Sequence, residues 1–306
     1  MNKLTFITCL MCVIASTKSD ESREADENEF PYIVRIKSSN TRCIGTLVTY
    51  SRVVTAGRCF YVLDKSSNKM VPENLNKYAA YAGSVYFFSS NILGRNIKNV
   101  SIHPKFAENP DRDYYHDIAL AELSSPFVKQ SGLRTINLSD KNKLMNAWDD
   151  VYSKNKTCYA VGWSWNLQEC DPKNNQLYLR FVWKYLQVIE IMPTTNSTCK
   201  KYAPTGEDMY TLGQVCTTGS NLKEGICGGD PGSPIICDGQ PLGLHLSNLV
   251  CSQFQMMHFY QLFWPYSSDF LSESGFAALS GSSHTSIDLF LLLIPIILRL
   301  LPVLHY

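Results

Sequence analysis

Short apolar runs alternate with polar clusters through the middle of the chain, between residues 30 and 271. The runs are rich in β-branched and aromatic residues, and clusters of Asn, Ser, Gly, Pro and Lys separate them. This spacing is typical of antiparallel barrels or sandwiches. We find no long amphipathic helix apart from a short C-terminal one near residues 262–271, so the pattern predicts an all-β body with two cores. The predicted strands are 32–36, 44–48, 52–56, 78–83, 97–102, 118–122, 159–163, 186–191, 234–237 and 242–246.

The N-terminal residues 1–19 have the pattern of a secretory signal peptide. Lys3 precedes an apolar stretch over residues 4–15, and small residues follow at Ala15, Ser16 and Ser19. The apolar stretch is too short to span a bilayer as a helix. The alternative is an N-terminal helix buried in the fold. Residues 20–29 contain six acidic residues and one arginine, and we expect them to form a flexible, acidic leader.

The C-terminal residues favour a membrane attachment signal. Residues 272–286 form a polar spacer, and residues 287–306 form a hydrophobic tail that Pro295, Arg299 and Pro302 interrupt. These interruptions weaken a membrane-spanning helix. Small residues, a short spacer and an apolar end are typical of a glycosylphosphatidylinositol (GPI) anchor signal. The alternatives are a single-pass tail anchor and a secreted protein with an apolar tail.

Charge and cysteine content narrow the function classes. Twenty-eight basic and 27 acidic residues leave a net charge of +1, too small for the basic surface of a nucleic-acid-binding protein. Eleven cysteines without zinc-ligand spacing point to disulfides and the secretory pathway, with no metal and no cofactor. Cys9 and Cys12 would leave with the signal peptide. Glycosylation sequons stand at Asn99, Asn137, Asn155 and Asn196.

Several ordered segments carry a family resemblance. They are Phe30-Pro-Tyr-Ile-Val34, Cys43-Ile-Gly-Thr-Leu-Val48, Val53-Val-Thr-Ala-Gly-Arg-Cys59, Asp117-Ile-Ala-Leu120, Cys158-Tyr-Ala-Val-Gly-Trp163, Cys227-Gly-Gly-Asp-Pro-Gly-Ser-Pro234 and Pro234-Ile-Ile-Cys237. In this order they resemble the trypsin-like serine proteases (peptidase S1). The resemblance covers residues 30–271 and implies two packed six-stranded antiparallel β-barrels with a cleft between them.

The resemblance also implies a disulfide framework. The implied pairs are Cys43–Cys59, Cys158–Cys237, Cys199–Cys216 and Cys227–Cys251. Each bond would stabilise the fold by about 2–4 kcal/mol, mainly by restricting the unfolded chain. Cys170 is left over, either as a sheltered thiol or as the site of an intermolecular bridge.

Two of the three catalytic positions implied by the family are changed. A serine protease needs a serine nucleophile, a histidine base and an aspartate that orients the histidine. Only the aspartate, Asp117, is kept. Arg58 replaces the histidine and stays protonated at biological pH, so it cannot act as a general base. It could instead form an ion pair with Asp117.

Pro231 stands in the serine position and has neither a hydroxyl nor a backbone N–H. The missing N–H would be one of two donors to the oxyanion, in the loop that begins at Gly229, and losing one donor typically costs about 2.7–4 kcal/mol. Asp230 would pair with the new N-terminus of an activated protease, but no Ile-Val-Gly-Gly-like segment follows Arg23. Ser233 could be proposed as a substitute nucleophile, but no motif places a histidine near it to activate it.

The expected substrate pocket is also changed, and the remaining histidines do not stand at catalytic positions. Gly225 or Ile226 stands where a trypsin-like member has its specificity acid, and Asn248 and Met256-Met257 lie near positions that the family keeps small. Bulky methionines there would fill the pocket. We expect the histidines of the body to be hydrogen-bonded or exposed residues without a catalytic or metal-binding role; they are His103, His116, His245 and His258.

We therefore predict a pseudoprotease, a non-catalytic serine protease homologue that is glycosylated and binds an extracellular protein partner through the protease scaffold. It would lie on the outer face of the plasma membrane or be secreted. One alternative is an active trypsin-like endopeptidase with non-standard residues. Another is a structural, disulfide-linked surface protein that dimerises through Cys170.

Overall fold

The computed structural model describes most of the body and neither end of the chain. The signal peptide, Cys170, Gly225, Gly229 and the C-terminal tail lie outside the described residues, as do the side chains of Cys227 and Cys251. The described residues are 22–39, 41–89, 93–107, 115–163, 166–167, 184–201, 209–210, 212–219, 226–227, 230–252 and 255–272.

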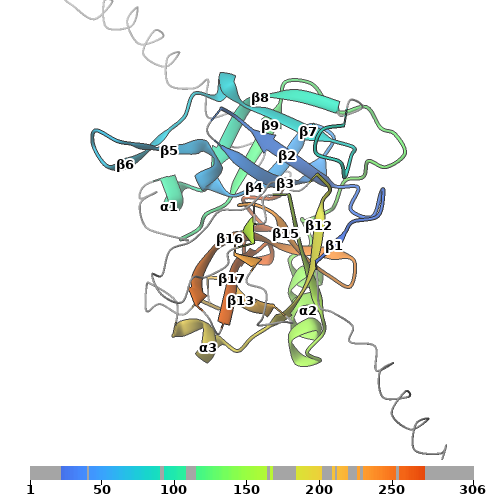
Figure 1. Cartoon of the computed structure of the whole chain (residues 1–306), viewed down its shortest axis with the longest axis vertical. Helices are drawn as coiled ribbons and strands as arrows, with labels where there is room; N and C mark the ends of the chain where they lie inside the picture. Colours follow the sequence, from blue (N-terminus) through green and yellow to red (C-terminus); the bar gives the residue numbers. More distant parts are fainter. Residues whose placement is uncertain are drawn as a thin grey trace, which may run out of the picture.

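The first barrel is closed and antiparallel (Figure 1). Every strand predicted in this half is present, with ends that differ by at most a few residues. Alternate residues such as Val34 and Ile36 are buried on the inside, which is the period expected of half-buried strands. In ring order the strands are β2 (Ile33–Lys37), β3 (Arg42–Thr49), β4 (Arg52–Thr55), β9 (Ala119–Leu123), β8 (Leu93–Ile102) and β7 (Ala79–Ala82).

The second barrel also has six strands, and pairing between β12 and β13 closes it. Four of its strands were predicted. In order they are β12 (Gln187–Pro193), β10 (Cys158–Gly162), β15 (Pro234–Cys237), β16 (Gln240–Ser252), β17 (Gln255–Leu262) and β13 (Gln214–Gly219). Two barrels of six antiparallel strands confirm the predicted fold class.

The predicted flexible leader is wrong for residues 22–29. Strand β1 (Arg23–Glu24) pairs with β12 at the edge of the second barrel. Ala25 is buried, and the Arg23 guanidinium binds both carboxylate oxygens of Glu29 at 2.9 and 2.5 Å. Backbone pairing and this internal ion pair offset the repulsion between the acids, so the leader packs on the barrel.

Helices are more extensive than the pattern indicated. Helix α2 (Lys141–Ser153) was missed, although Asp140 caps its N-terminus and it buries Leu144, Trp148 and Val151 at helical spacing. The C-terminal helix expected near residues 262–271 is shorter, because β17 continues to Leu262 and only the 3-10 turn η3 (Trp264–Tyr266) follows. No helix in the described residues is long and apolar enough to cross a membrane.

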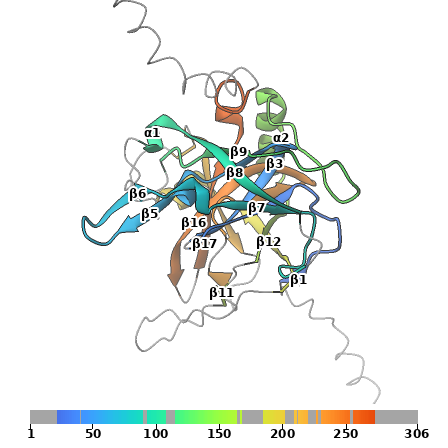
Figure 2. The same cartoon turned by 90° about the horizontal axis from the view of Figure 1, so that it is seen from above.

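Short elements complete the described structure. The hairpin of β5 (Tyr61–Asp64) and β6 (Lys69–Pro72) projects from the first barrel in both views (Figures 1 and 2). The other elements are η1 (Gly57–Phe60), η2 (Leu75–Lys77), α1 (Pro104–Ala107), α3 (Asn196–Lys200) and the pair β11 (Asn166–Leu167) and β14 (Ile226–Cys227).

Disulfides connect neighbouring elements. Three of the four implied bonds are present in the described part of the chain, namely Cys43–Cys59, Cys158–Cys237 and Cys199–Cys216. The side chains of the fourth implied pair, Cys227 and Cys251, lie outside that part, so this pairing stays a prediction. The bond between Cys43 and Cys59 links β3 to η1, next to the candidate site.

Candidate functional site

The candidate site forms where three segments, distant in sequence, meet between the barrels. Arg58 lies in η1, directly after β4, and Asp117 lies just before β9. Because β4 and β9 pair along their lengths, with Thr55 opposite Ala119, these two side chains meet. The segment that begins at Asp230 comes from the second barrel and binds the first, since the Ile44 N–H donates to the Pro231 carbonyl at 3.0 Å.

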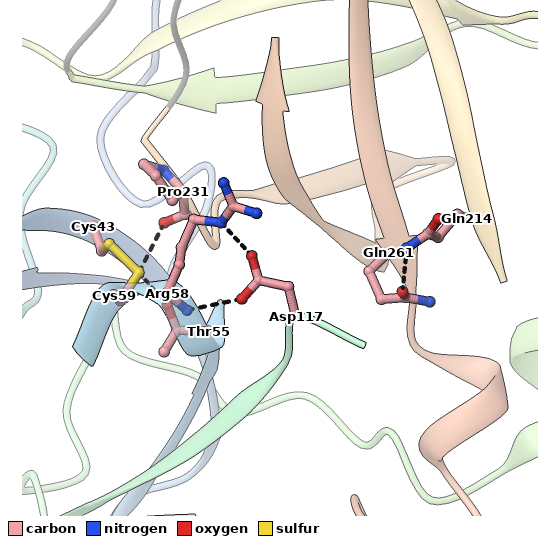
Figure 3. A network of polar contacts seen from close by, with 8 residues as sticks. All are labelled: Cys43, Thr55, Arg58, Cys59, Asp117, Gln214, Pro231 and Gln261. Carbon is pink, nitrogen blue, oxygen red and sulfur yellow. Dashed lines mark hydrogen bonds and ion pairs between the residues drawn. A yellow bond between two sulfur atoms is a disulfide. The ribbon is translucent and has the colours of Figure 1, made fainter. Parts of the chain in front are cut away.

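Arg58 and Asp117 form the ion pair that the sequence suggested. The Arg58 Nε donates to Asp117 Oδ2, and the Arg58 backbone N–H donates to Oδ1 at 2.8 Å (Figure 3). The Asp117 carboxylate is fully buried, whereas 21% of the Arg58 side chain is exposed. A buried carboxylate needs such charge-assisted bonds to stay ionised. The Asp117 carboxylate is therefore bound by the permanently charged guanidinium of Arg58.

The Pro231 loop is held rigidly against the first barrel. Gly232 has a φ of +81°, and a Cβ added there would lie 2.2 Å from Thr55 Oγ1 and 2.3 Å from the Ile44 carbonyl oxygen. Only glycine fits this close approach. The Gly232 N–H donates to the His245 carbonyl at 2.8 Å, and the His245 N–H donates to the Ser233 carbonyl at 2.6 Å. The loop is thus tied to both barrels.

Ser233 is buried beside strand β10. The residue is 3% exposed, and its hydroxyl donates to the Val161 carbonyl. The contact between Ser233 and His245 described above runs through backbone atoms. Ser233 is thus buried and uses its proton in a structural bond.

Asp230 has a backbone partner that the sequence did not reveal. Its Oδ2 accepts the Trp163 N–H at 2.8 Å, and the residue is buried. Arg35, on β2, is its cationic neighbour. Burial lowers the pKa of Arg35, and the negative charge of Asp230 opposes that effect. An arginine in the middle of a predicted strand was the available signal for this neighbour.

The histidines gather in two pairs, which the sequence did not show. The rings of His103 and His116 stack with centroids 4.6 Å apart, and His116 Nδ1 lies 2.8 Å from the Tyr266 hydroxyl. Burial is the main cause that lowers the pKa of His116 to about 4.

His245 and His258 form the second pair, inside the second barrel, with ring centroids 5.9 Å apart. Burial lowers the pKa of His258 to about 3. Both rings are packed inside the barrel, which agrees with structural roles. In the described part of the chain, no group of three His, Cys, Asp or Glu side chains could hold a metal ion.

The structure describes only some of the residues on which the substrate-pocket and glycosylation predictions depend. Met257 is fully buried on β17, whereas the side chains of Ile226, Asn248 and Met256 lie outside those described. Among the sequons, Asn137 and Asn155 are exposed, and Asn99 and Asn196 are half-buried. Both predictions stay open.

Comparisons with known proteins agree with the two-barrel fold. The family model described as Trypsin matches residues 20–268. Kallikrein 1-related peptidase b1 of Mus musculus is 25% identical over 224 residues, covering 72% of this chain and 76% of that protein. Trypsin of Sus scrofa is 24% identical over 226 residues, covering 74% and 82%. Neuropsin, a serine protease expressed in the limbic system of mouse brain, superposes with a TM-score of 0.58 at 19% identity, covering 80% of this chain and 95% of that one, and shows the fold.

Proposed function

Because this chain belongs to the trypsin family, we propose that it is a non-catalytic serine protease homologue that binds a protein partner through the protease scaffold. The observation that carries the proposal is the Arg58 guanidinium bound to the buried Asp117 carboxylate. In an active protease this carboxylate orients an imidazole that takes the proton of the serine. A guanidinium cannot take that proton at any biological pH.

Pro231 supports the same conclusion independently. It stands where the nucleophile is expected and offers neither a hydroxyl nor a donor to the oxyanion. Ser233, the nearest hydroxyl in the loop, is buried and donates to Val161. Base, nucleophile and one oxyanion donor would thus be lost together.

The cellular setting is part of the proposal. Three disulfides favour an oxidising compartment. We propose that the N-terminal residues direct secretion, that the sequons carry glycans, and that the C-terminal tail signals a GPI anchor. Release of the protein from intact cells by phosphatidylinositol-specific phospholipase C would test the anchor.

Catalysis can be tested with the full chain expressed in secretory cells. We expect no turnover of peptide esters above buffer and no labelling by a biotinylated fluorophosphonate, with pig trypsin as the positive control. Labelling that disappears in Ser233→Ala would contradict the proposal and favour the alternative of an active endopeptidase. A dimer that forms without reductant and vanishes in Cys170→Ser would favour the disulfide-linked structural alternative.

The double variant Arg58→His with Pro231→Ser tests how far the scaffold has diverged. We expect no recovery of trypsin-like activity, with kcat/KM at least about 10³-fold below that of trypsin, because the pocket and the activation segment would still be wrong. Peptide-ester hydrolysis measures this. The single variant Arg58→His is the matched control. Activity within tenfold of trypsin in the double variant would show that only the two triad positions separate this chain from an active protease.

A further inference from the structure

Aromatic rings are exposed where the segment after β7 meets the segment before β12. Phe88 is 62% exposed and Tyr185 is 40% exposed, and the Tyr86 ring lies 6.1 Å from Phe88 and 5.1 Å from Tyr185. We call Tyr86, Phe88 and Tyr185 the aromatic patch. Clustered exposed rings raise the free energy of the isolated protein in water, so such clusters commonly mark interaction surfaces.

The backbone beneath this patch is fixed. Tyr86 and Tyr185 form an antiparallel bridge. On either side, the Phe87 N–H donates to the Lys184 carbonyl at 2.7 Å and the Leu186 N–H donates to the Val85 carbonyl at 2.8 Å. The rings are therefore presented on paired backbone, which lowers the entropy that binding would cost.

A basic pocket adjoins the aromatic patch. Its lining includes three cationic residues, Arg35, Lys37 and Arg42, and we call this lined hollow the basic pocket. Phe87 connects the two features, because its ring lies 4.9 Å from that of Phe88 and 4.0 Å from the Arg35 guanidinium carbon. Cations and exposed rings thus form one continuous surface.

The arrangement of the cations in the pocket lowers the stability of the fold. Lys37 and Arg42 are exposed and stand directly opposite each other on β2 and β3. Like charges in this position are destabilising. Neither forms an ion pair with another described residue. The arrangement is therefore better explained by an anionic ligand than by folding.

The one carboxylate in the lining does not neutralise this charge. Asp230 is buried and accepts the Trp163 N–H. Arg35 also has a backbone acceptor, the Phe87 carbonyl, while its Nε is buried without a hydrogen bond. Three cations against one carboxylate leave the pocket positive, in a chain whose net charge is only +1.

We propose that this surface binds a segment of a partner protein in which acidic residues stand next to aromatic or aliphatic side chains. Carboxylates of the partner would pair with Lys37 and Arg42, and its apolar side chains would cover Phe88 and Tyr185. A sulfated polysaccharide would satisfy the cations and leave the rings in water, so a peptide fits the whole surface better. This inference rests on the proposed function and names the chemistry of its partner.

The test measures binding of fluorescein-labelled poly(Glu,Tyr) to the full chain by fluorescence anisotropy, with poly(Lys,Tyr) and heparin as comparison probes. We expect the acidic copolymer alone to bind well, and its Kd to rise about tenfold or more in Lys37→Glu/Arg42→Glu. In Phe88→Ala/Tyr185→Ala we expect a rise of about fivefold to tenfold, the usual range for interface aromatics.

Matched controls come from the C-terminal end of α2, where Tyr152 lies in the last turn and Lys154 follows the helix. Tyr152 is 44% exposed, close to the value for Tyr185, and the Lys154 side chain is 64% exposed. Tyr152→Ala/Lys154→Glu should leave the Kd within about twofold of the parent. Thermal unfolding of each variant checks that its fold is kept, as expected for exposed positions.

Two results would overturn the inference. Equal affinity for poly(Glu,Tyr) in the parent and both pocket and patch variants would show that the surface is not used. Heparin binding that depends on Lys37 and Arg42 but not on Phe88 and Tyr185 would assign the surface to a polysaccharide. Neither result changes the fluorophosphonate and ester tests, so failure of this inference is distinguishable from failure of the proposed function.

Discussion

At the scale of single residues, the central interaction is a permanent cation on a buried carboxylate. The Asp117 carboxylate accepts hydrogen bonds from the Nε and the backbone N–H of Arg58. No part of this carboxylate is exposed. Ion pairs of this kind contribute little beyond what an apolar pair would, but breaking one is strongly destabilising because a buried charge is left alone. Arg58 therefore has a structural role that is independent of any catalytic history.

We expect Arg58→Met to lower the free energy of unfolding by about 3–5 kcal/mol, since Asp117 would lose its cation. Urea denaturation of the secreted protein measures this. The control is the double variant Arg58→Met/Asp117→Asn, which removes both charges and should be less destabilised than the single one. Equal stability of Arg58→Met and the parent would mean that the pair does not support the fold.

At the scale of elements, the Pro231 loop is positioned by contacts with both barrels. Its backbone bonds to Ile44 and to His245, and Gly232 packs against Thr55. Local sequence alone favours a turn at Asp-Pro-Gly, but the tight approach of two barrels is what excludes any side chain at Gly232. The loop thus keeps its shape without a nucleophile.

We expect Gly232→Ala to be far more destabilising than Gly239→Ala. Both glycines have positive φ, +81° and +72°, so each variant pays about 1–2 kcal/mol for a left-handed alanine. Only at Gly232 does the added Cβ also meet backbone and side-chain atoms, whereas nothing lies within 4 Å of the Cβ at Gly239. The difference, which we expect to exceed about 2 kcal/mol, can be measured by urea denaturation; equal losses would refute the packing argument.

At the scale of the whole molecule, buried histidines connect stability to pH. His245 and His258 lie in the core of the second barrel, and His103 and His116 join the first barrel to the C-terminal segment through Tyr266. Burial holds the pKa of His258 at about 3 and that of His116 at about 4. The folded state keeps His116 and His258 neutral, whereas the unfolded chain protonates them below a pH of about 6.5.

Stability should therefore be complete above pH 6.5 and fall as the pH drops toward 4. While a histidine is protonated only in the unfolded chain, it lowers the free energy of unfolding by up to about 1.4 kcal/mol per pH unit. Urea denaturation at pH 7, 6 and 5 tests this, because most carboxylates titrate below that range. His258→Gln should flatten the slope by about one proton. A slope unchanged by this substitution would show that His258 does not titrate as described.

Much of the fold followed from local pattern and ordered motifs. All ten predicted strands are present, because alternating burial leaves a period of two in the sequence. Strands β13 and β17 were missed because glutamines and histidines interrupt their apolar pattern, and these polar side chains are buried only once the barrel closes. Helix α2 was missed although Leu144, Trp148 and Val151 have helical spacing.

Three chemical groups can be read from the residues alone: a guanidinium at 58, a carboxylate at 117 and a pyrrolidine ring at 231. Their proton chemistry does not depend on the fold. Which groups meet depends on how the chain folds in three dimensions. Folding pairs Arg58 with Asp117, gives Asp230 the Trp163 N–H, buries Ser233, and brings Lys37 and Arg42 beside Phe87. Contacts of this kind join residues far apart along the chain, and barrel closure, strand register and burial set them, none of which a local pattern contains.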